Sequence, residues 1–249
     1  MLGPDRILAA GSFDFEGKAF IIAGASGGIG KAIIKKLLEG GATVYSNSRR
    51  PLDFQHPKLF HSCGDITDES FVADWVESID KIDGLVYGAG MIDPRPIRFE
   101  TKESLKKVWD VNYFSAVDLV SNLIKQRKFN KFNASVFISS ISARAPYIGG
   151  SKYVGSKAAL EVFSKVMVME MAPKKARANC LAPAMVRTEM YDKGIDKGSA
   201  ERMQEHIDKY PFGIGEPEDI AQACCFLLSD ASRWINCVTL TMDGGYLMT

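Results

Sequence analysis

The hydrophobic pattern of the chain alternates between two kinds of segment. Short apolar runs of the length of a buried strand occur at residues 18–23, 43–48, 59–63, 84–87, 134–138, 177–182 and 238–242. Between most of them, apolar residues recur at helical spacing over residues 29–39, 68–79, 104–128, 158–171 and 216–228. Since strands and helices alternate throughout, the pattern predicts an α/β fold built on a doubly wound, Rossmann-like parallel sheet.

The domain organisation follows from the length and from the segments that break this pattern. With 249 residues the chain fits one domain, which we place at residues 16–249. Residues 1–15 are expected to be a flexible lead-in, without the basic and apolar parts of a signal peptide. Only a short segment separates residue 50 from residue 59, so that crossover should lack a full helix. The charged, glycine-punctuated segment 189–211 is typical of a mobile lid.

Composition and charge exclude several classes of function. A net charge of +1 argues against nucleic acid or an anionic membrane as the main partner. No apolar run approaches the roughly 20 residues that span a bilayer. The five cysteines are scattered and lack metal-ligand spacing, which favours reduced thiols and a cytoplasmic location. The three histidines form no recognisable ligand set, so we expect no metal site.

A glycine-rich turn follows the first strand and opens the first helix. Its glycines are Gly24, Gly28 and Gly30, and Ile29 begins the apolar face of the helix. Gly24 permits a tight turn, Gly28 lets the backbone approach a pyrophosphate, and Gly30 lets the helix pack closely on the strand. The helix N-terminus then offers free N–H groups and a positive dipole end to phosphates. A turn without any ligand is the alternative.

The end of the second strand carries arginines and no acid. In dinucleotide-binding folds an acidic residue there selects NAD, whereas a basic residue accommodates the 2′-phosphate of NADP. Ser48 and Arg49 are the predicted phosphate contacts, with Arg50 in reserve and Ser26 as a helper. The cofactor predicted from this segment is NADP(H). Solvated surface arginines, and a preference for NAD, are the alternatives.

A candidate proton-transfer site lies between residues 139 and 157. Tyr153 and Lys157 are four residues apart, so on a helix they lie on the same face. A phenol has a pKa of about 10, and a neighbouring ammonium favours its ionised form and brings that pKa toward a useful range. A serine at the end of the preceding strand could hydrogen-bond a carbonyl that Tyr153 protonates. Without a cofactor the same spacing is common on helix surfaces.

Taken together, these motifs resemble those of the short-chain dehydrogenase/reductase family. The resemblance covers nearly all of residues 15–246 and rests on the glycine turn, Asn112, Ser140, the Tyr153 and Lys157 pair, and further residues of the cofactor side. It implies that Ser140 orients the carbonyl, that Tyr153 donates the proton, and that Lys157 lowers the pKa of the tyrosine and holds the nicotinamide ribose. Asn112 would support a water-linked proton relay, and family members are homotetramers or dimers.

The same resemblance implies contacts to the rest of the cofactor. Asp65 and Ile66 would contact the adenine, Ala89 and Gly90 the adenosine ribose side, and Pro183, Val186 and Thr188 the nicotinamide side.

Four positions depart from the family pattern. Ala23 replaces a threonine before the glycine turn, and Tyr87-Gly88 stands where Asn-Asn is frequent, which puts the side-chain bracing of the fourth strand in doubt. Ala184 replaces a glycine beside the nicotinamide, and Asn236-Cys237 replaces Thr-Gly. None of the four is a catalytic position, so we expect an active enzyme.

These residues determine the substrate less closely than they determine the cofactor. Similarity to 3-oxoacyl-carrier-protein reductases predicts a small-molecule or carrier-bound ketone, and basic residues at 125–128 and 174–175 could receive an acidic carrier. Arg95, Arg98 and Arg144 could instead hold a sugar or hydroxy acid. Ser142, Arg144 and Tyr147 are the predicted substrate wall. A non-catalytic NADP-binding scaffold is the alternative from another class.

Overall fold

The computed structural model describes residues 13–189, 204–205 and 207–248. Within these residues, parallel strands form one seven-stranded sheet in the order β3-β2-β1-β4-β5-β6-β7. The strands are β1 (Ala19–Ala23), β2 (Thr43–Ser48), β3 (Leu59–Cys63), β4 (Ile82–Tyr87), β5 (Phe129–Ile138), β6 (Arg177–Pro183) and β7 (Thr239–Met242). The predicted doubly wound parallel sheet is therefore confirmed.

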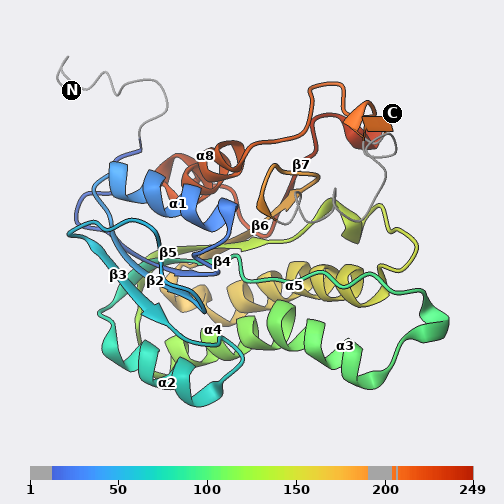
Figure 1. Cartoon of the computed structure of the whole chain (residues 1–249). Coiled ribbons are helices and arrows are strands. Elements are labelled where there is room, and N and C mark those ends of the chain that lie inside the picture. Colours follow the sequence, from blue (N-terminus) through green and yellow to red (C-terminus); the bar gives the residue numbers. More distant parts are fainter. Residues whose placement is uncertain (1–12, 190–203, 206, 249) are drawn as a thin grey trace.

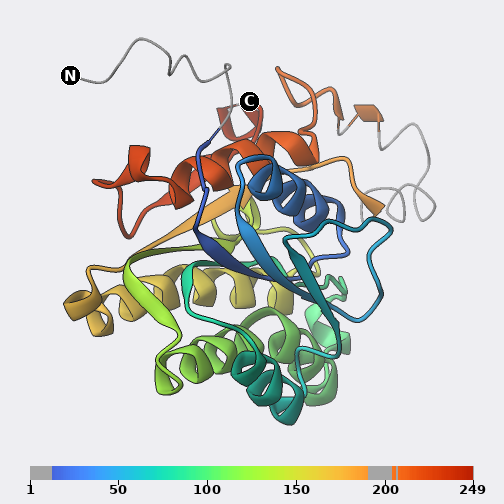
Figure 2. The ribbon, with the colours of Figure 1, turned by 90° about the vertical axis from the view of Figure 1, so that its left-hand side faces the viewer.

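Helices cover both faces of the sheet (Figures 1 and 2). One layer contains α1 (Gly28–Glu39) and α8 (Pro217–Leu228), and the other contains α2 (Glu69–Ser78), α3 (Lys102–Trp109), α4 (Ser115–Lys125) and α5 (Ser151–Glu170). Each layer buries its own apolar cluster against the sheet. Asp68 caps α2 by accepting hydrogen bonds from two backbone N–H groups, and no helix interrupts the crossover between β2 and β3, as predicted.

The sheet topology places the candidate residues at one edge. β1 pairs in parallel with β2 and with β4, and Ala23 lies opposite both Asn47 and Tyr87. The strand order therefore reverses at β1: β2 and β3 lie on one side of it, and β4 to β7 lie on the other. In such sheets the ligand crevice lies outside the carboxyl ends of the strands at this switch point.

Several predicted boundaries are wrong. The single helix expected over 104–128 is divided by a π-helical segment, Asp110–Phe114, at whose end Ser115 Oγ donates to the Asp110 carbonyl at 2.6 Å. Strand β5 begins at residue 129 rather than 134, and α5 begins at 151 rather than 158. Propensity missed the first two turns of α5 because glycine and serine are weak helix formers, while tertiary packing holds them.

The N-terminal boundary also needs correction. Phe15 is fully buried, stacks edge-on against Phe20, and donates its backbone N–H to the Gly40 carbonyl at 2.7 Å. Phe15 is therefore not part of a flexible lead-in, because its apolar ring completes the core beside α1, and most of that prediction falls on residues 1–12, outside the described residues. Most of the predicted lid lies outside the described residues. Of its remainder, Tyr210 is buried and stacks on Tyr246.

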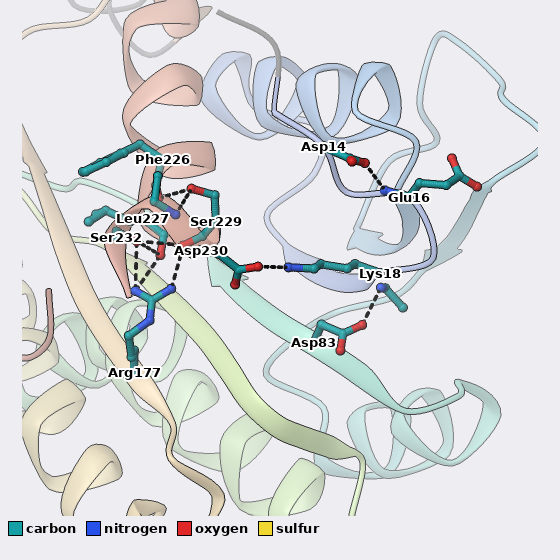
Figure 3. A network of polar contacts seen from close by, with 12 residues as sticks. Asp14, Glu16, Lys18, Asp83, Arg177, Phe226, Leu227, Ser229, Asp230 and Ser232 are labelled. Carbon is teal, nitrogen blue, oxygen red and sulfur yellow. Dashed lines mark hydrogen bonds and ion pairs between the residues drawn. The ribbon is translucent and has the colours of Figure 1, made fainter. Parts of the chain in front are cut away.

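An arginine at the start of β6 joins the sheet to the end of α8 (Figure 3). The Arg177 guanidinium donates to the carbonyls of Leu227 and Ser229 at 2.9 and 3.0 Å, and to Ser232 Oγ at 3.0 Å. Asp230, in the same turn, pairs with Lys18 at 3.2 Å. The guanidinium therefore satisfies carbonyls at the C-terminus of α8 that have no partner inside the helix.

Candidate active site

The two glycine turns at the carboxyl edge of the sheet touch each other. A Cβ atom on Gly24 would lie 2.5 Å from the Ala89 nitrogen, and one on Gly30 would collide with the Gly24 carbonyl oxygen. Gly24 also has a φ of +91°, which L-residues with side chains rarely adopt. Larger residues are thus excluded at both positions, as predicted for a turn that packs a helix tightly on a strand.

Two further glycines show which predicted residues come together. A Cβ on Gly28 would lie 3.0 Å from Thr188 Cγ2, and one on Gly90 would lie 3.2 Å from Lys157 Nζ and 3.6 Å from Asn112 Oδ1. The glycine turn therefore lies beside the segment after β6, and the second glycine turn lies beside the π-helical segment and α5.

Helix α1 is built to receive an anion. It begins at Gly28 without a side-chain cap and has no acidic residue in its first turn. No capping side chain or first-turn carboxylate of the helix therefore occupies its first N–H groups or neutralises its positive dipole end. This backbone cradle fits the pyrophosphate of a dinucleotide. Ser26 is half-buried within the turn, and Ile29 packs against the apolar cluster of this layer.

The serine and tyrosine of the predicted site are hydrogen-bonded. Ser142 Oγ donates to Ser140 Oγ at 2.8 Å, so Ser142 helps to fix the Ser140 hydroxyl. Burial raises the pKa of Tyr153, and its hydrogen bond with Ser140 partly opposes that rise. The predicted lowering of the Tyr153 pKa by Lys157 is not found, because desolvation of a phenolate in this buried position is the larger effect.

Lys157 is buried beside the tyrosine. Its Nζ lies 5.8 Å from the centroid of the Tyr153 ring and donates to the Ile138 carbonyl at 2.7 Å. Burial lowers the pKa of Lys157 to about 8, because the ammonium loses its hydration there. The ammonium is mostly retained at neutral pH and is held at the end of β5.

Asn112 lies in the π-helical segment, and both the oxygen and the nitrogen of its side-chain amide form hydrogen bonds. Its Oδ1 accepts from the Met91 N–H at 2.8 Å, and its Nδ2 donates to the Met91 carbonyl at 3.1 Å and to Ser156 Oγ at 3.0 Å. Asn112 thereby ties the second glycine turn to α5. Its role in a proton relay stays a prediction.

Tyr87 supplies the bracing of β4 that the sequence put in doubt. It is fully buried, and its hydroxyl donates to the Val111 carbonyl at 2.5 Å, next to Asn112. Burial raises the pKa of Tyr87 well above its ordinary value, so the phenol stays a donor. The tyrosine thus connects the strand directly to the π-helical segment.

The predicted ribose contacts at the end of β2 divide into two kinds. Ser48 is buried, its Oγ donates to the Arg50 carbonyl at 2.6 Å, and His61 Nε2 lies 3.4 Å away. Arg50 forms an ion pair of 3.1 Å with Glu189 across the crevice. Arg49 is exposed and has no ion-pair partner among the described residues. Of the two arginines, Arg49 is the one available to a phosphate.

The other predicted cofactor contacts also border this edge. Asp65 is exposed and accepts from the N–H and hydroxyl of Thr67 at 2.9 and 2.8 Å, while Ile66 and Ala89 are buried. Pro183 ends β6, and Val186 is buried and forms a bridge with Gly215.

The predicted substrate wall is mainly apolar. Tyr147 is part of an open cavity of about 380 Å³ whose lining residues are Pro96, Ile97, Pro146, Tyr147, Ile148, Gly149, Gly150, Ser151 and Val154. Burial, and then the charge of Tyr153, raise the pKa of Tyr147 to about 12. Arg144 instead pairs with Glu161 on α5 at 3.1 Å.

The described part of the chain has neither a metal-binding cluster nor a membrane-spanning helix. It contains no group of three or more His, Cys, Asp or Glu side chains that could hold a metal ion. None of its helices has the length and apolar character to cross a membrane.

Comparisons with known proteins agree with this geometry. A family model described as enoyl-(acyl carrier protein) reductase matches residues 24–247. The 3-oxoacyl-acyl-carrier-protein reductase FabG of Rickettsia bellii is 32% identical over 243 residues, covering 94% of this chain and 99% of the relative. The D-erythrulose reductase of Gallus gallus is 30% identical over 243 residues, with coverage of 94% and 98%.

The chain belongs to the short-chain dehydrogenase/reductase family. It is accordingly an oxidoreductase that acts on alcohol or ketone groups. Among solved structures, the ligand-free aldohexose dehydrogenase of Thermoplasma acidophilum superimposes with a TM-score of 0.86 at 27% identity, covering 94% of this chain and 96% of that one. A short-chain dehydrogenase family protein of Francisella tularensis gives a TM-score of 0.86 at 26% identity, with coverage of 93% and 99%.

Three features of this short-chain dehydrogenase/reductase escaped sequence reasoning. They are the π-helical segment, the Tyr87 hydrogen bond, and a buried ionic cluster around Lys152. The sequence shows that Tyr87 departs from the family pattern. Its phenol is a hydrogen-bond donor, and this is the signal from which its role could be predicted. The other two depend on contacts between distant residues.

Proposed function

We propose that this protein is an NADP(H)-dependent enzyme that reduces a ketone to a secondary alcohol or catalyses the reverse oxidation. The observation that carries the proposal is the convergence of Tyr153, Ser140 and Lys157 beside a glycine turn shaped for a pyrophosphate. When bound, NADPH would supply the hydride, and its phosphates would lie on the N–H groups of the turn around Gly28.

The protein's own residues would then manage the proton. The raised pKa of Tyr153 keeps its hydroxyl protonated at neutral pH, so it can donate to the oxygen of a reduced carbonyl. Ser140, fixed by Ser142, would hydrogen-bond the same oxygen and orient it. The Lys157 ammonium, held by the Ile138 carbonyl, adds positive charge where the phenolate forms.

Replacing Tyr153 with Phe tests the proposal. We expect kcat to fall by about 10²- to 10⁴-fold, as is usual for loss of a general acid, while NADPH binding measured by fluorescence stays the same. The substrates offered are erythrulose, xylulose and the N-acetylcysteamine thioester of acetoacetate, followed by NADPH absorbance. Undiminished turnover in the variant would remove Tyr153 from the mechanism. NADPH binding by the wild type without turnover of any ketone would favour the scaffold alternative.

Preference for NADP over NAD rests on Arg49. Its guanidinium is exposed and unpaired among the described residues, whereas Arg50 is engaged by Glu189. A charge-assisted hydrogen bond to a phosphate is worth about 1.5–3 kcal/mol, which is roughly 10- to 100-fold in affinity. We therefore expect Arg49→Ala to weaken NADPH binding by that factor and to leave NADH binding unchanged. Equal losses for both cofactors would argue against this assignment, and Arg50→Ala is the matched comparison.

The apolar cavity beside Tyr147 favours a ketone that carries a hydrocarbon part, as in a 3-oxoacyl thioester. Polar groups for a sugar are less evident there, since Arg144 is paired with Glu161. Reductases of both kinds are among the relatives, so the sugar alternative stands. The basic segment 125–128 supports carrier docking only weakly, because the Lys128 ammonium donates to the carbonyls of Glu77 and Ile79. Competition between the thioester and erythrulose for turnover separates the two classes.

We also infer that the enzyme is a homo-oligomer, a dimer or tetramer. Apolar side chains lie exposed along α5 (Val162, Val166 and Met169) and near the C-terminus (Trp234, Leu240 and Met248). Val162, Val166 and Met169 lie on one face of the helix by their spacing, and monomeric proteins rarely leave a large apolar patch uncovered. Sedimentation equilibrium of the purified chain tests this, and a monomer at micromolar concentration would refute it.

A further inference from the structure

A buried lysine directly precedes the candidate catalytic tyrosine. The Lys152 side chain is fully buried, and its Nζ lies 2.7 Å from Asp93 Oδ2, 3.1 Å from Glu100 Oε2 and 3.1 Å from Ser104 Oγ. An ammonium at such depth is tolerated only when charges and hydrogen bonds replace its hydration. The three acceptors provide this, so Lys152 is committed to them and not to the crevice.

The acceptors come from one loop and from the helix that follows it. Asp93 and Glu100 lie near the two ends of residues 91–100, which leave the second glycine turn and lead into α3. Glu100 also accepts from Ser104 Oγ at 2.5 Å and from Ser151 Oγ at 3.4 Å. A single ammonium therefore ties both ends of this loop to the first turn of α5.

Further charge interactions and a backbone hydrogen bond also hold loop 91–100 against the start of α5. The hydrogen bond from Lys152 is the main cause that lowers the pKa of Asp93, and a hydrogen bond from Ser104, followed by one from Lys152, lowers the pKa of Glu100. The Arg95 guanidinium, 4.0 Å from Asp93, offsets the excess negative charge. In the middle of the loop, the Arg95 N–H donates to the Gly149 carbonyl at 2.9 Å.

The closed loop forms one side of the apolar cavity. Pro96 and Ile97 come from the loop, and Tyr147 and Ile148 face them from the segment before α5. If the loop moved away, the cavity would lose this side, whereas the N–H groups around Gly28 belong to a different turn, which in the described part of the chain has no hydrogen bond or ion pair to Lys152, Asp93 or Glu100. The consequence would fall on the substrate and not on the dinucleotide.

We propose that Lys152, Asp93 and Glu100 are positioning residues that hold loop 91–100 against the start of α5 and thereby set the affinity for the substrate. The substrate part of this inference rests on the proposed reductase function, whereas the anchoring of the loop does not.

The anchoring is tested by hydrogen–deuterium exchange on the full chain without substrate or NADPH. Lys152→Met keeps the length of the side chain and removes its charge. We expect amide exchange in residues 91–100 to accelerate at least tenfold, while residues 82–87 of β4 keep the wild-type rate. The matched control is Lys106→Met on α3, where the ammonium pairs with Asp110 at 2.6 Å but is 72% exposed. Wild-type exchange in loop 91–100 of a folded Lys152→Met protein would overturn the proposal.

A second variant covers the case in which Lys152→Met does not fold. Asp93→Asn removes one partner and leaves Glu100 and Ser104 in place. We expect faster exchange confined to the half of the loop nearest Asp93. Exchange equal to that of the wild type would overturn the proposal here as well.

The consequence for the substrate is read from steady-state kinetics with the N-acetylcysteamine thioester of acetoacetate. We expect Lys152→Met to raise KM at least tenfold, with kcat within threefold of wild type and NADPH binding unchanged. A fall in kcat at unchanged KM would show that Lys152 acts on Tyr153 and not through the loop, which contradicts the proposal. If the wild type reduces no ketone, the proposed function fails, and the exchange measurement still decides the anchoring.

Discussion

Two lysines of α5 are buried close to the same tyrosine, and their surroundings give them different properties. Lys152 is surrounded by carboxylates and a hydroxyl, which replace its lost hydration. Lys157 donates to a backbone carbonyl, and burial lowers its pKa to about 8. At the scale of the residue, the first lysine is suited to holding structure together. The second is suited to a site where charge must respond to chemistry.

This difference predicts how stability depends on pH. The unfolded chain keeps Lys157 protonated up to its ordinary pKa near 10.5, whereas the folded protein releases that proton near pH 8. Between these values the unfolded state binds more protons, so this lysine makes stability rise with pH. Relative to Lys157→Met, the wild type should gain on the order of 2–3 kcal/mol from pH 8 to pH 10.5 in urea unfolding.

The comparison between the two proteins isolates Lys157 from the tyrosines and cysteines that titrate in the same range. Lys165→Met, at an exposed position of the same helix, is the control. Parallel stability curves for the wild type and Lys157→Met would contradict the prediction.

At the scale of the element, the glycine turn and the π-helical segment decide how α1 and α4 approach the crevice. In the turn, the limit is space: a Cβ on Gly30 would meet the Gly24 carbonyl, whereas one on Gly27 would have no neighbour closer than 3.9 Å. In the π-helical segment, the Tyr87 hydroxyl donates to the Val111 carbonyl and the Ser115 hydroxyl donates to the Asp110 carbonyl. Both elements are irregular where the ligand crevice begins.

The turn gives a matched pair of substitutions. Gly30→Ala should destabilise the protein by about 1–3 kcal/mol and weaken NADPH binding, because the helix must move away from the strand. Gly27→Ala has free space and a φ of −76°, so its cost should stay within about 1 kcal/mol. Urea unfolding and NADPH fluorescence measure both effects, and equal losses for the two variants would show that close packing is not the constraint.

At the scale of the whole molecule, polar contacts between distant residues join the end of α8 and the turn that follows it to the sheet. Arg177 at the start of β6 reaches carbonyls at the end of α8, and Asp230 of the same turn reaches Lys18 before β1 (Figure 3). The Arg177 guanidinium is half-buried and donates hydrogen bonds to several acceptors. The contact between Lys18 and Asp230 is an exposed ion pair, with side-chain exposures of 32% and 89%.

The two contacts should therefore contribute unequally to stability. Arg177→Met removes a half-buried guanidinium together with the charge-assisted hydrogen bonds that it donates to Leu227, Ser229 and Ser232, and we expect a loss of about 2–4 kcal/mol. Lys18→Met removes an exposed ion pair and should cost at most about 1 kcal/mol. The free energy of unfolding in urea measures both, and a loss in Lys18→Met as large as that in Arg177→Met would contradict this ranking.

The sequence by itself determined the features that depend on neighbours along the chain. The order of strands and helices, the glycine turn, and the spacing of Ser140, Tyr153 and Lys157 all follow from local periodicity and conformational preference, and the structure agrees with them. Element boundaries were less accurate, because the first turns of α5 and the π-helical segment are held by packing rather than by propensity.

Only the tertiary structure decided which distant groups meet. The partners of Lys152 lie 52 residues away at Glu100 and 59 away at Asp93, and Arg50 meets Glu189 across 139 residues. The direction of the Tyr153 pKa also depends on burial, which no single segment determines. The physical reason is common to all three: desolvation and ion pairing depend on which loops the sheet brings to the same edge, and local sequence does not carry that information.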